Sequence, residues 1–264
     1  MKQTVKRILK RAGYDLHRIE PTFVPFVRHF TFAGQPFDFW IGNPDAEWWY
    51  QEEGWKIAGE YKELTRLCKS GDRILEIGSH QGFTGILCAI FSQANGSVVS
   101  LEAHPLNAMI ATAQLGANPS IKNLRFINAA GGDHEGSVQI APKHNSSVVP
   151  GGGEATVEVP LRTGDALDKE LGPFNVLKID VEGFENMVLK GCKEILRRKP
   201  KIAIEVHIDS LAKYGSGVAE VLEQIHIKDY HGTMVVRPDY NTVKPFAVEQ
   251  LPATGIANLF LTPL

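Results

Sequence analysis

The sequence predicts an α/β fold: a doubly wound, mostly parallel sheet of seven strands with an antiparallel C-terminal strand. From residue 57 onward, short apolar runs alternate with segments of helical periodicity, a rhythm typical of parallel strands connected by helices. Near the C-terminus, the apolar runs at 234–237 and 257–263 follow each other with no helical segment between them. Strands joined without a crossover helix run antiparallel, so we expect such a pair at the sheet edge.

Composition and charge place the chain among ordinary globular proteins. Its 264 residues are 43% apolar with a net charge of −2, which suits one large domain with a small addition and argues against a general polyanion binder. The sequence has no run of about 18 apolar residues, the length that spans a bilayer. The three cysteines lie far apart without a metal-binding spacing, which favours a reducing compartment. Because the first residues lack the apolar core of a signal peptide, we expect a cytoplasmic location.

Residues 1–56 are predicted to form an extension to a larger domain at 57–264. Residues 1–20 carry six lysines and arginines among apolar residues at helical spacing, which predicts a short basic helix. This helix either lies solvated on the domain or makes weak peripheral contact with an anionic membrane, and its thin apolar face favours the first interpretation. No basic patch with interleaved aromatic residues follows, so a nucleic-acid partner is not expected.

The rest of the extension is rich in aromatic residues. All four tryptophans lie within residues 21–61, and residues 28–41 alternate aromatic and other side chains around the turn 33–36, a pattern that predicts a β-hairpin. Most of these residues are interpreted as a cap on one end of the domain. One or two tryptophans are candidates for the wall of a substrate site, since flat aromatic faces suit ring-shaped substrates.

The larger domain begins with a helix predicted over 57–68 and a short apolar strand over 73–77. Apolar residues then recur at intervals of three and four between Phe83 and Phe91, the mark of a helix with one buried face. The same patterns predict strands at 97–102, 124–128, 174–180 and 202–207, and helices at 105–115 and 184–195.

The segment 136–161 interrupts this alternation. The runs 137–141 and 156–161 alternate like two strands of a hairpin, and Pro150 is followed by three glycines. Such a glycine-rich tip is predicted to be mobile and to act as a lid.

The turn after the first strand is the first sign of a ligand site. Gly78, Gly82 and Gly85 lie where a strand leads into a helix, the place where open α/β sheets bind ligands. Their spacing differs from the G-x-G-x-x-G of dinucleotide proteins, because His80 stands where the middle glycine would be. The turn therefore indicates a nucleoside cofactor other than a dinucleotide. Glu76 is a candidate to bind a positively charged group of that cofactor.

The ends of the next two strands also suit a nucleoside. Glu102 ends the second strand, where a carboxylate can accept hydrogen bonds from both ribose hydroxyls. Asn128, Ala129 and Ala130 follow the third strand with Asp133 close behind. Small side chains there leave room for an adenine ring, and Asp133 or a backbone carbonyl is a candidate acceptor for its amino group.

Chemistry is expected at the fourth and fifth strands. Lys178 and Asp180 alternate with apolar residues in a strand that should be buried on both faces, and a buried charge is costly unless it is paired or functional. Glu205 and His207 lie two residues apart on the fifth strand and so point to one face. A histidine beside a carboxylate suits general-base catalysis. Asp180, Glu205 and His207 are also a ligand set that accepts a divalent metal, although no metal is assigned.

Five segments carry a family resemblance. ILEIGSHQGFTG, LEAHP, NAAGGDHEG, LKIDVEGFE and IEVH resemble the FkbM-type family of S-adenosylmethionine-dependent methyltransferases, from about Glu60 to the C-terminus. The most specific piece, KIDVEGFE, is similar to that family's D-x-E-G-x-E signature. The family commonly has Asp at the position of Glu76 and Ala-Asn at the positions of Ser79 and His80. The glutamate keeps the charge, whereas His80 changes how the methionine end of the cofactor would be held.

The resemblance implies S-adenosylmethionine as cofactor and O-methylation of a sugar, a polysaccharide or a secondary metabolite. The hypothesis for catalysis makes His207 or Asp180 the base that removes the hydroxyl proton, with Glu205 orienting the histidine. In a variant, Asp180 and its neighbours bind a metal that acidifies the hydroxyl. The candidate cofactor-binding residues are Glu76, Gly78, Ser79, His80, Gly82, Phe83, Thr84, Glu102, Ala103, Asn128, Ala129, Ala130 and Asp180.

Two other function classes fit the same fold, because a fold does not determine a function. The first is a non-catalytic module that binds a nucleoside or a sugar. The second is an NAD-dependent oxidoreductase, which the turn at His80 disfavours.

Overall fold

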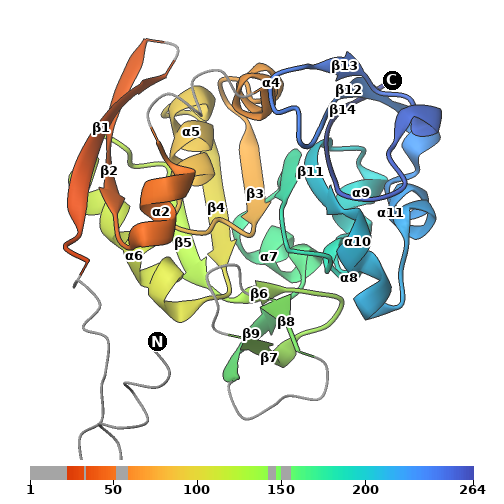
Figure 1. The fold of residues 1–264 in the computed structure, drawn as a ribbon, viewed down its shortest axis with the longest axis horizontal. Helices are drawn as coiled ribbons and strands as arrows, with labels where there is room; N and C mark the ends of the chain where they lie inside the picture. Colours follow the sequence, from red (N-terminus) through yellow and green to blue (C-terminus); the bar gives the residue numbers. More distant parts are fainter. Residues whose placement is uncertain (1–22, 33, 52–58, 142–146, 150–155) are drawn as a thin grey trace, which may run out of the picture.

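The computed structural model describes residues 23–32, 34–51, 59–141, 147–149 and 156–264. Its centre is an eight-stranded sheet in the order β13-β12-β14-β11-β10-β3-β4-β5 (Figure 1). The strands of this sheet are β3 (Arg73–Ile77), β4 (Ser97–Glu102), β5 (Leu124–Asn128), β10 (Val176–Ile179), β11 (Lys201–His207), β12 (Tyr230–Val236), β13 (Lys244–Pro245) and β14 (Ile256–Pro263).

The predicted mostly parallel sheet is confirmed, because β5, β4, β3, β10 and β11 pair in parallel. The sheet has one strand more than predicted, the two-residue β13. The predicted antiparallel pair is present at one end of the sheet as β14 and β12: β14 lies between β11 and β12 and is antiparallel to both, and only the two-residue β13 lies beyond β12. After β11 the chain forms α11 (Val218–Ile225) and then β12, which does not pair with β11. The position between these two strands is taken by β14, which forms backbone hydrogen bonds with both.

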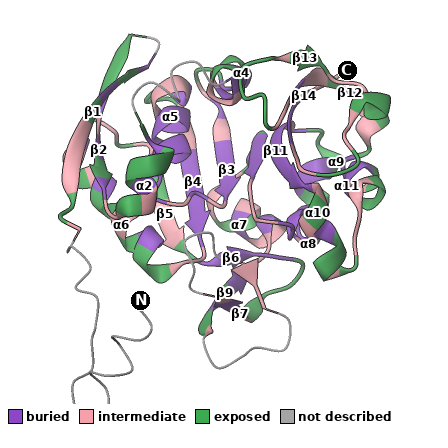
Figure 2. Ribbon diagram, viewed as in Figure 1, coloured by how far each residue is buried: buried purple, intermediate pink, exposed green. Residues whose placement is uncertain are grey.

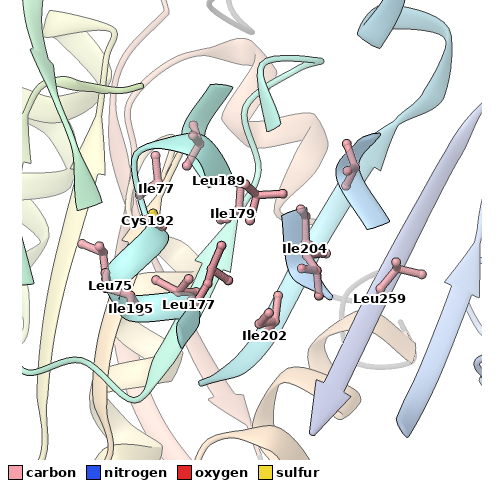
Figure 3. Close-up of a cluster of buried hydrophobic side chains, with 14 of the residues drawn as sticks. Leu75, Ile77, Leu177, Ile179, Leu189, Cys192, Ile195, Ile202, Ile204 and Leu259 are labelled. Carbon is pink, nitrogen blue, oxygen red and sulfur yellow. The ribbon is translucent and has the colours of Figure 1, made fainter. Parts of the chain in front are cut away.

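Helices cover both faces of the sheet. One face packs against α7 (Gly164–Leu171), α8 (Glu185–Lys190), α9 (Lys193–Arg197) and α11, and the other against α4 (Gly59–Leu67), α5 (Phe83–Ser92) and the hairpin β1–β2. Neighbouring residues of a strand, such as Ile74 and Leu75, therefore belong to different cores. Figure 3 shows the first of these cores, with side chains of β3, β10, β11 and β14 facing those of α8 and α9. In Figure 2, β3, β4 and β11 are buried over most of their length.

The helices depart from the sequence expectation in two ways. The helix predicted over 184–195 is two helices, α8 and α9, with a break around Gly191. A Cβ atom at Gly191 would lie 2.0 Å from the carbonyl oxygen of Gly132, so the backbone makes a close contact here that only glycine allows. Several short elements were not expected: α2 (Pro44–Trp49), α7, α10 (Ile208–Leu211), α11 and the 3₁₀ turns Ala212–Tyr214, Ile227–Asp229 and Val248–Gln250.

The predicted aromatic hairpin is present as β1 (Phe26–Phe32) and β2 (Gln35–Ile41), paired antiparallel. It lies beside α6 (Pro105–Ala117), at the left of Figure 1. The side chain of Gln114 accepts a hydrogen bond from the backbone N–H of Trp40 at 2.7 Å and donates one to its carbonyl at 3.0 Å. The Gln114 amide thus pairs with backbone groups on the edge of β2 that does not pair with β1, and these groups would otherwise lack hydrogen-bond partners.

A second, four-stranded sheet lies at the bottom of Figure 1 and contains the other predicted hairpin. Its strands are β6 (Ala130–Gly131), β9 (Val157–Arg162), β7 (Gly136–Ala141) and β8 (Ser147–Val148), and β7 and β9 are antiparallel as predicted. The predicted basic helix over 1–20 and the predicted mobile tip at 150–153 fall outside the described residues. Among the helices that the structure describes, none is long and apolar enough to cross a membrane.

Candidate active site

A cavity of about 520 Å³ opens at the carboxyl ends of β3, β4, β10 and β11. The register explains why these ends meet: Ile77 pairs with Leu101 on one side and with Ile179 on the other, and Ile179 pairs with Ile204. The polar residues at or just beyond these positions are therefore brought to one edge of the sheet. The volume is in the range of sites that bind small molecules and cofactors.

The glycine turn forms the floor of the cavity next to β10. Gly78 has φ +90°, and a Cβ atom at this position would lie 1.7 Å from the carbonyl oxygen of Asp180. The backbone N–H groups of Gly78 and Ser79 donate to the carbonyl of Leu101 at 2.9 and 3.0 Å. The Ser79 hydroxyl is buried, lines the cavity, and has no hydrogen-bond partner within the described residues. A bound polar group would satisfy this hydroxyl.

Glu102 lines the cavity at the end of β4. Its two carboxylate oxygens accept from the backbone N–H groups of His80 at 2.7 Å and His104 at 2.8 Å. A carboxylate has about four acceptor sites, so these two bonds hold the group in place and leave capacity for two ligand hydroxyls. Burial raises the pKa of Glu102 to about 7, although the two backbone bonds act in the opposite direction.

His80 is held between this carboxylate and the N-terminal aromatic residues. Its ring nitrogen Nδ1 lies 2.9 Å from the hydroxyl of Tyr50, and its backbone has φ +50°. Glu182, which also lines the cavity, has φ +55°. Non-glycine residues in this conformation cost energy and are frequent at functional sites.

A third part of the wall is small and apolar. Ala103, Ala129, Ala130 and Gly131 line the cavity together with Ile140 of β7 and Val148 of β8, so the second sheet contributes to the site. Asn128 does not line it: its amide donates to the carbonyls of Glu102 and Ala103 at 2.8 and 3.0 Å and holds the loop. Asp133, the predicted adenine acceptor, contacts His134 outside the cavity.

Three more of the sequence candidates lie behind the cavity wall. Glu76 is fully buried and contacts the hydroxyls of Thr84 and Ser100, with the ammonium of Lys178 at 3.4 Å. Its charge is thus neutralised inside the protein, which contradicts its assignment as the partner of a positive group of the cofactor. Gly82 and Phe83 also do not line the cavity, since the turn at Gly82 buries Phe83 among aromatic residues. Thr84 does line it.

Asp180, Glu205 and His207 form a cluster on the opposite side. One ligand atom from each lies within 4.8 Å of those of the other two. The His207 ring points Nε2 toward Glu182 and Glu205, with distances of 3.4 and 3.6 Å to a carboxylate oxygen of each. These three residues were predictable from the sequence because each is a polar residue at the end of a predicted strand.

Glu185, and not Glu205, orients the histidine. Nδ1 of His207 lies 2.7 Å from Oε1 of Glu185, which is fully buried and also accepts from the backbone N–H of Gly183 at 3.0 Å. Glu205 instead pairs with the guanidinium of Arg237 at 2.7 Å. The sequence hypothesis is therefore wrong on this point, because Glu185 of α8 holds the His207 ring and Glu205 contacts Arg237 instead.

The cluster lies in a field of excess negative charge. Glu60, Glu102, Asp180, Glu182 and Glu205 all line the cavity, against one lysine and one arginine of its described wall. Burial raises the pKa of Glu205 and Glu60, whereas Lys178 lowers the pKa of Asp180 despite burial. Burial alone would lower the pKa of His207, but Glu185 and three further carboxylates raise it to about 9. The imidazole is therefore protonated near neutral pH and is not by itself a free base.

Aromatic residues form the outer wall of the cavity. Trp48 and Trp49 of α2 line it with an edge-to-face contact of 4.8 Å between ring centroids, and Trp48 is 64% exposed. The guanidinium of Arg237 lies 5.9 Å from the ring centroid of Trp49 and 5.0 Å from that of Tyr240. Sequence reasoning missed Arg237, Tyr240 and Glu60. They come from segments far apart in the chain, and only the fold brings them together.

The chain is similar to one protein family in its sequence and to several solved structures in its fold. A family model described as the methyltransferase FkbM domain matches residues 76–231, which include the glycine turn and the cluster. No curated protein matches the sequence.

Among solved structures, fibrillarin of Aeropyrum pernix with bound S-adenosylmethionine is 13% identical, with a TM-score of 0.50 over 89% of this chain and 82% of that one. A precorrin-6y C5,15-methyltransferase of Geobacter metallireducens is 13% identical, with a TM-score of 0.47 over 78% of this chain and 86% of that one. A Thermotoga maritima O-methyltransferase is 12% identical, with a TM-score of 0.43 over 90% and 78%. At such identities the likeness concerns the fold.

Proposed function

The chain belongs to the FkbM methyltransferase family and uses S-adenosylmethionine, and we propose that it methylates a hydroxyl group of a sugar, a polysaccharide or a secondary metabolite. One observation carries this proposal. A single cavity combines a half suited to a nucleoside, formed by the glycine turn and Glu102, with a half that carries Asp180, Glu205 and His207 beside exposed aromatic rings.

The nucleoside half fits the cofactor group by group. The tight turn at Gly78 and the Ser79 hydroxyl suit its amino-acid end. Glu102, fixed by two backbone N–H groups, is placed to accept both ribose hydroxyls. The small residues Ala129 and Ala130, with the apolar side chains of the second sheet, suit the adenine ring. When bound, the cofactor supplies a methyl group on a sulfonium, which is a good leaving group.

The other half is proposed to hold the acceptor. Trp48 and Trp49 present flat faces that a ring-bearing molecule can cover, and they belong to the predicted N-terminal extension. This extension is thus assigned to acceptor binding and the domain over 57–264 to the cofactor and the chemistry. The polar cluster activates the hydroxyl, and the protein mainly positions the two reactants for in-line displacement.

Two substitutions test the proposal. Asp180→Asn and His207→Ala should each lower methyl transfer by at least about a hundredfold, because each removes a group that activates the hydroxyl. Binding of S-adenosylhomocysteine, measured by calorimetry, should change little. The matched controls are Asp133→Asn and His231→Ala, residues outside the cavity. The assay follows transfer from S-adenosylmethionine to a panel of sugars and hydroxylated metabolites.

The outcome that contradicts the proposal is near-normal transfer by both variants with an accepted substrate. Cofactor binding without transfer to any hydroxyl would instead support the non-catalytic module, which shares the fold. The family match favours methyl transfer over the NAD-dependent oxidoreductase.

A further inference from the structure

We infer that Asp180, Glu205 and His207 bind a divalent metal cation that accepts both oxygen and nitrogen ligands, as Mn²⁺ does. The role given to this cation rests on the proposed function. Its binding stands on the geometry of the cluster alone and is tested separately.

The three side chains are spaced for a shared ion. Their ligand atoms lie within 4.8 Å of one another. Metal–ligand distances of about 2.1 Å place two ligands of one ion no more than about 4.2 Å apart, so adjustments of less than about 1 Å are enough. Asp180 follows β10, and Glu205 and His207 belong to β11, which pairs with β10. Neighbouring strands of one sheet hold ligands more precisely than loops do.

Glu185 supports His207 as carboxylates support histidine ligands in metal sites. Such a histidine donates its second ring N–H to a carboxylate, which fixes the ring, and the metal takes the place of the proton on the other nitrogen. Here Nδ1 of His207 meets Oε1 of Glu185 at 2.7 Å, and Nε2 points to the carboxylates of the cavity. The Oε2 atom of Glu185 is buried without a hydrogen-bond partner among the described residues. A fully buried carboxylate of this kind is costly, and orienting a ligand gives it a function.

The positively charged side chains beside the cluster do not occupy every carboxylate oxygen. Lys178 lies 3.6 Å from Oδ2 of Asp180, and Arg237 contacts Oε1 of Glu205. Each pair uses one carboxylate oxygen and leaves a second. At Glu205 the oxygen that contacts Arg237 is the same Oε1 that lies 3.6 Å from Nε2 of His207, so the ion would either share this oxygen with Arg237 or bind Oε2. Five carboxylates line the cavity against one lysine and one arginine of its described wall, and a divalent cation reduces this excess of negative charge.

The ligand set narrows the choice of metal. Carboxylates suit Mg²⁺, Ca²⁺ and Mn²⁺, whereas imidazole suits later transition metals such as Zn²⁺. Two carboxylates with one imidazole favour a divalent cation that accepts both kinds of ligand over Ca²⁺, and Mn²⁺, which does so, is the probe for the site.

The cation would activate the acceptor hydroxyl as a Lewis acid. Held by Asp180, Glu205 and His207, the cation would lower the pKa of a hydroxyl bound to it, and Glu182, which is not one of the three ligands and lies 3.4 Å from Nε2 of His207, would accept the hydroxyl proton. As the oxygen–carbon bond forms, the carbon–sulfur bond breaks, and the sulfonium becomes a neutral thioether. The products are the methyl ether, S-adenosylhomocysteine and the proton on Glu182.

The test is a titration of chelator-treated protein with MnCl₂, with free Mn²⁺ followed by electron paramagnetic resonance. We expect one site per chain, with or without S-adenosylhomocysteine. Asp180→Asn, Glu205→Gln and His207→Ala should each weaken Mn²⁺ binding at least about tenfold. Glu185→Gln should weaken it by about ten- to a hundredfold, as for other second carboxylates of metal-bound histidines. The controls Glu194→Gln and His231→Ala, outside the cavity, should leave it unchanged.

The wild-type protein provides a measurement that does not depend on how a variant folds. Bound Mn²⁺ should show electron spin-echo modulation from a histidine nitrogen. Absence of saturable Mn²⁺ binding, or binding without this nitrogen signal, would overturn the inference. Methyl transfer undiminished by a chelator would contradict the catalytic role given to the cation. Failure of the proposed function looks different: Mn²⁺ would bind with its nitrogen signal, but S-adenosylhomocysteine would not bind or no hydroxyl would be methylated.

Discussion

Glu102 has two functions that depend on one another. It fixes the loop after the glycine turn by accepting from the N–H groups of His80 and His104, and it presents its remaining acceptor sites to the cavity. Because burial raises its pKa to about 7, its charge changes in the range where most assays are made. A carboxylate accepts hydrogen bonds from ribose hydroxyls, whereas its protonated form loses part of this capacity.

Cofactor affinity should therefore depend on pH. The raised pKa means that Glu102 is ionised above pH 7 and takes up a proton as the pH falls through 7. Affinity for S-adenosylhomocysteine should be close to full at pH 8 and lower at pH 6 by up to about tenfold, since only about a tenth of the sites are then ionised. Calorimetry at both pH values measures the change. In Glu102→Gln, which cannot ionise, affinity should be low at both values, and an unaltered tenfold change in this variant would rule out Glu102 as the titrating group.

Among single residues, the sequence predicted the site residues that lie at the ends of strands. It did not predict the residues of other elements that contact them. Asp180, Glu205 and His207 were recognisable because buried polar groups at the ends of neighbouring parallel strands converge. Glu185 was not, because its contact with His207 depends on how α8 packs against the sheet. Glu76 was misassigned, since the sequence does not show that Lys178 and two hydroxyls surround it.

Among the elements, α2 is the one to which the proposed function gives the most direct part in acceptor specificity. Asn43 caps this short helix by accepting from the N–H of Ala46 at 2.8 Å, and the helix carries Trp48 and Trp49 to the mouth of the cavity. Trp48 is 64% exposed, and an exposed tryptophan in a cavity wall is typical of a ligand contact.

Trp48→Ala should raise the KM for the acceptor by about tenfold, which corresponds to ~1.4 kcal/mol of binding energy. The kcat should change little, because the indole lies outside the polar cluster. Steady-state kinetics with an accepted hydroxyl substrate measures both constants. Trp40→Ala is the matched control, because Trp40 is 37% exposed on β2 but does not line the cavity. Equal effects of the two substitutions would contradict an acceptor-binding role for α2.

The central strands were predictable because a buried parallel strand is a short apolar run, and β4, β5 and β11 begin and end within a residue of the predicted positions. The break between α8 and α9 was not, because apolar periodicity continues across it. Only the approach of Gly191 to the backbone of Gly132 shows the reason. The place of β14 inside the sheet was likewise hidden, since strand order depends on pairing between distant segments.

For the whole molecule, the parallel register is what makes the site. Five strands pair in parallel so that their carboxyl ends meet at one edge, and a hydrophobic core packs against each face of the sheet. Under the proposed function, the turn after β3 and the end of β4 would face the nucleoside, and the ends of β10 and β11 would face the acceptor. The α2 helix and the second sheet close the cavity from outside the main sheet.

A crystal structure with S-adenosylhomocysteine bound tests this division of the cavity most directly. The account predicts the ribose hydroxyls within hydrogen-bond distance of the Glu102 carboxylate and the thioether sulfur facing Asp180 and His207. The space between the sulfur and these side chains should be open to Trp48. A nucleoside bound away from Glu102, or a sulfur that faces away from the cluster, would contradict it.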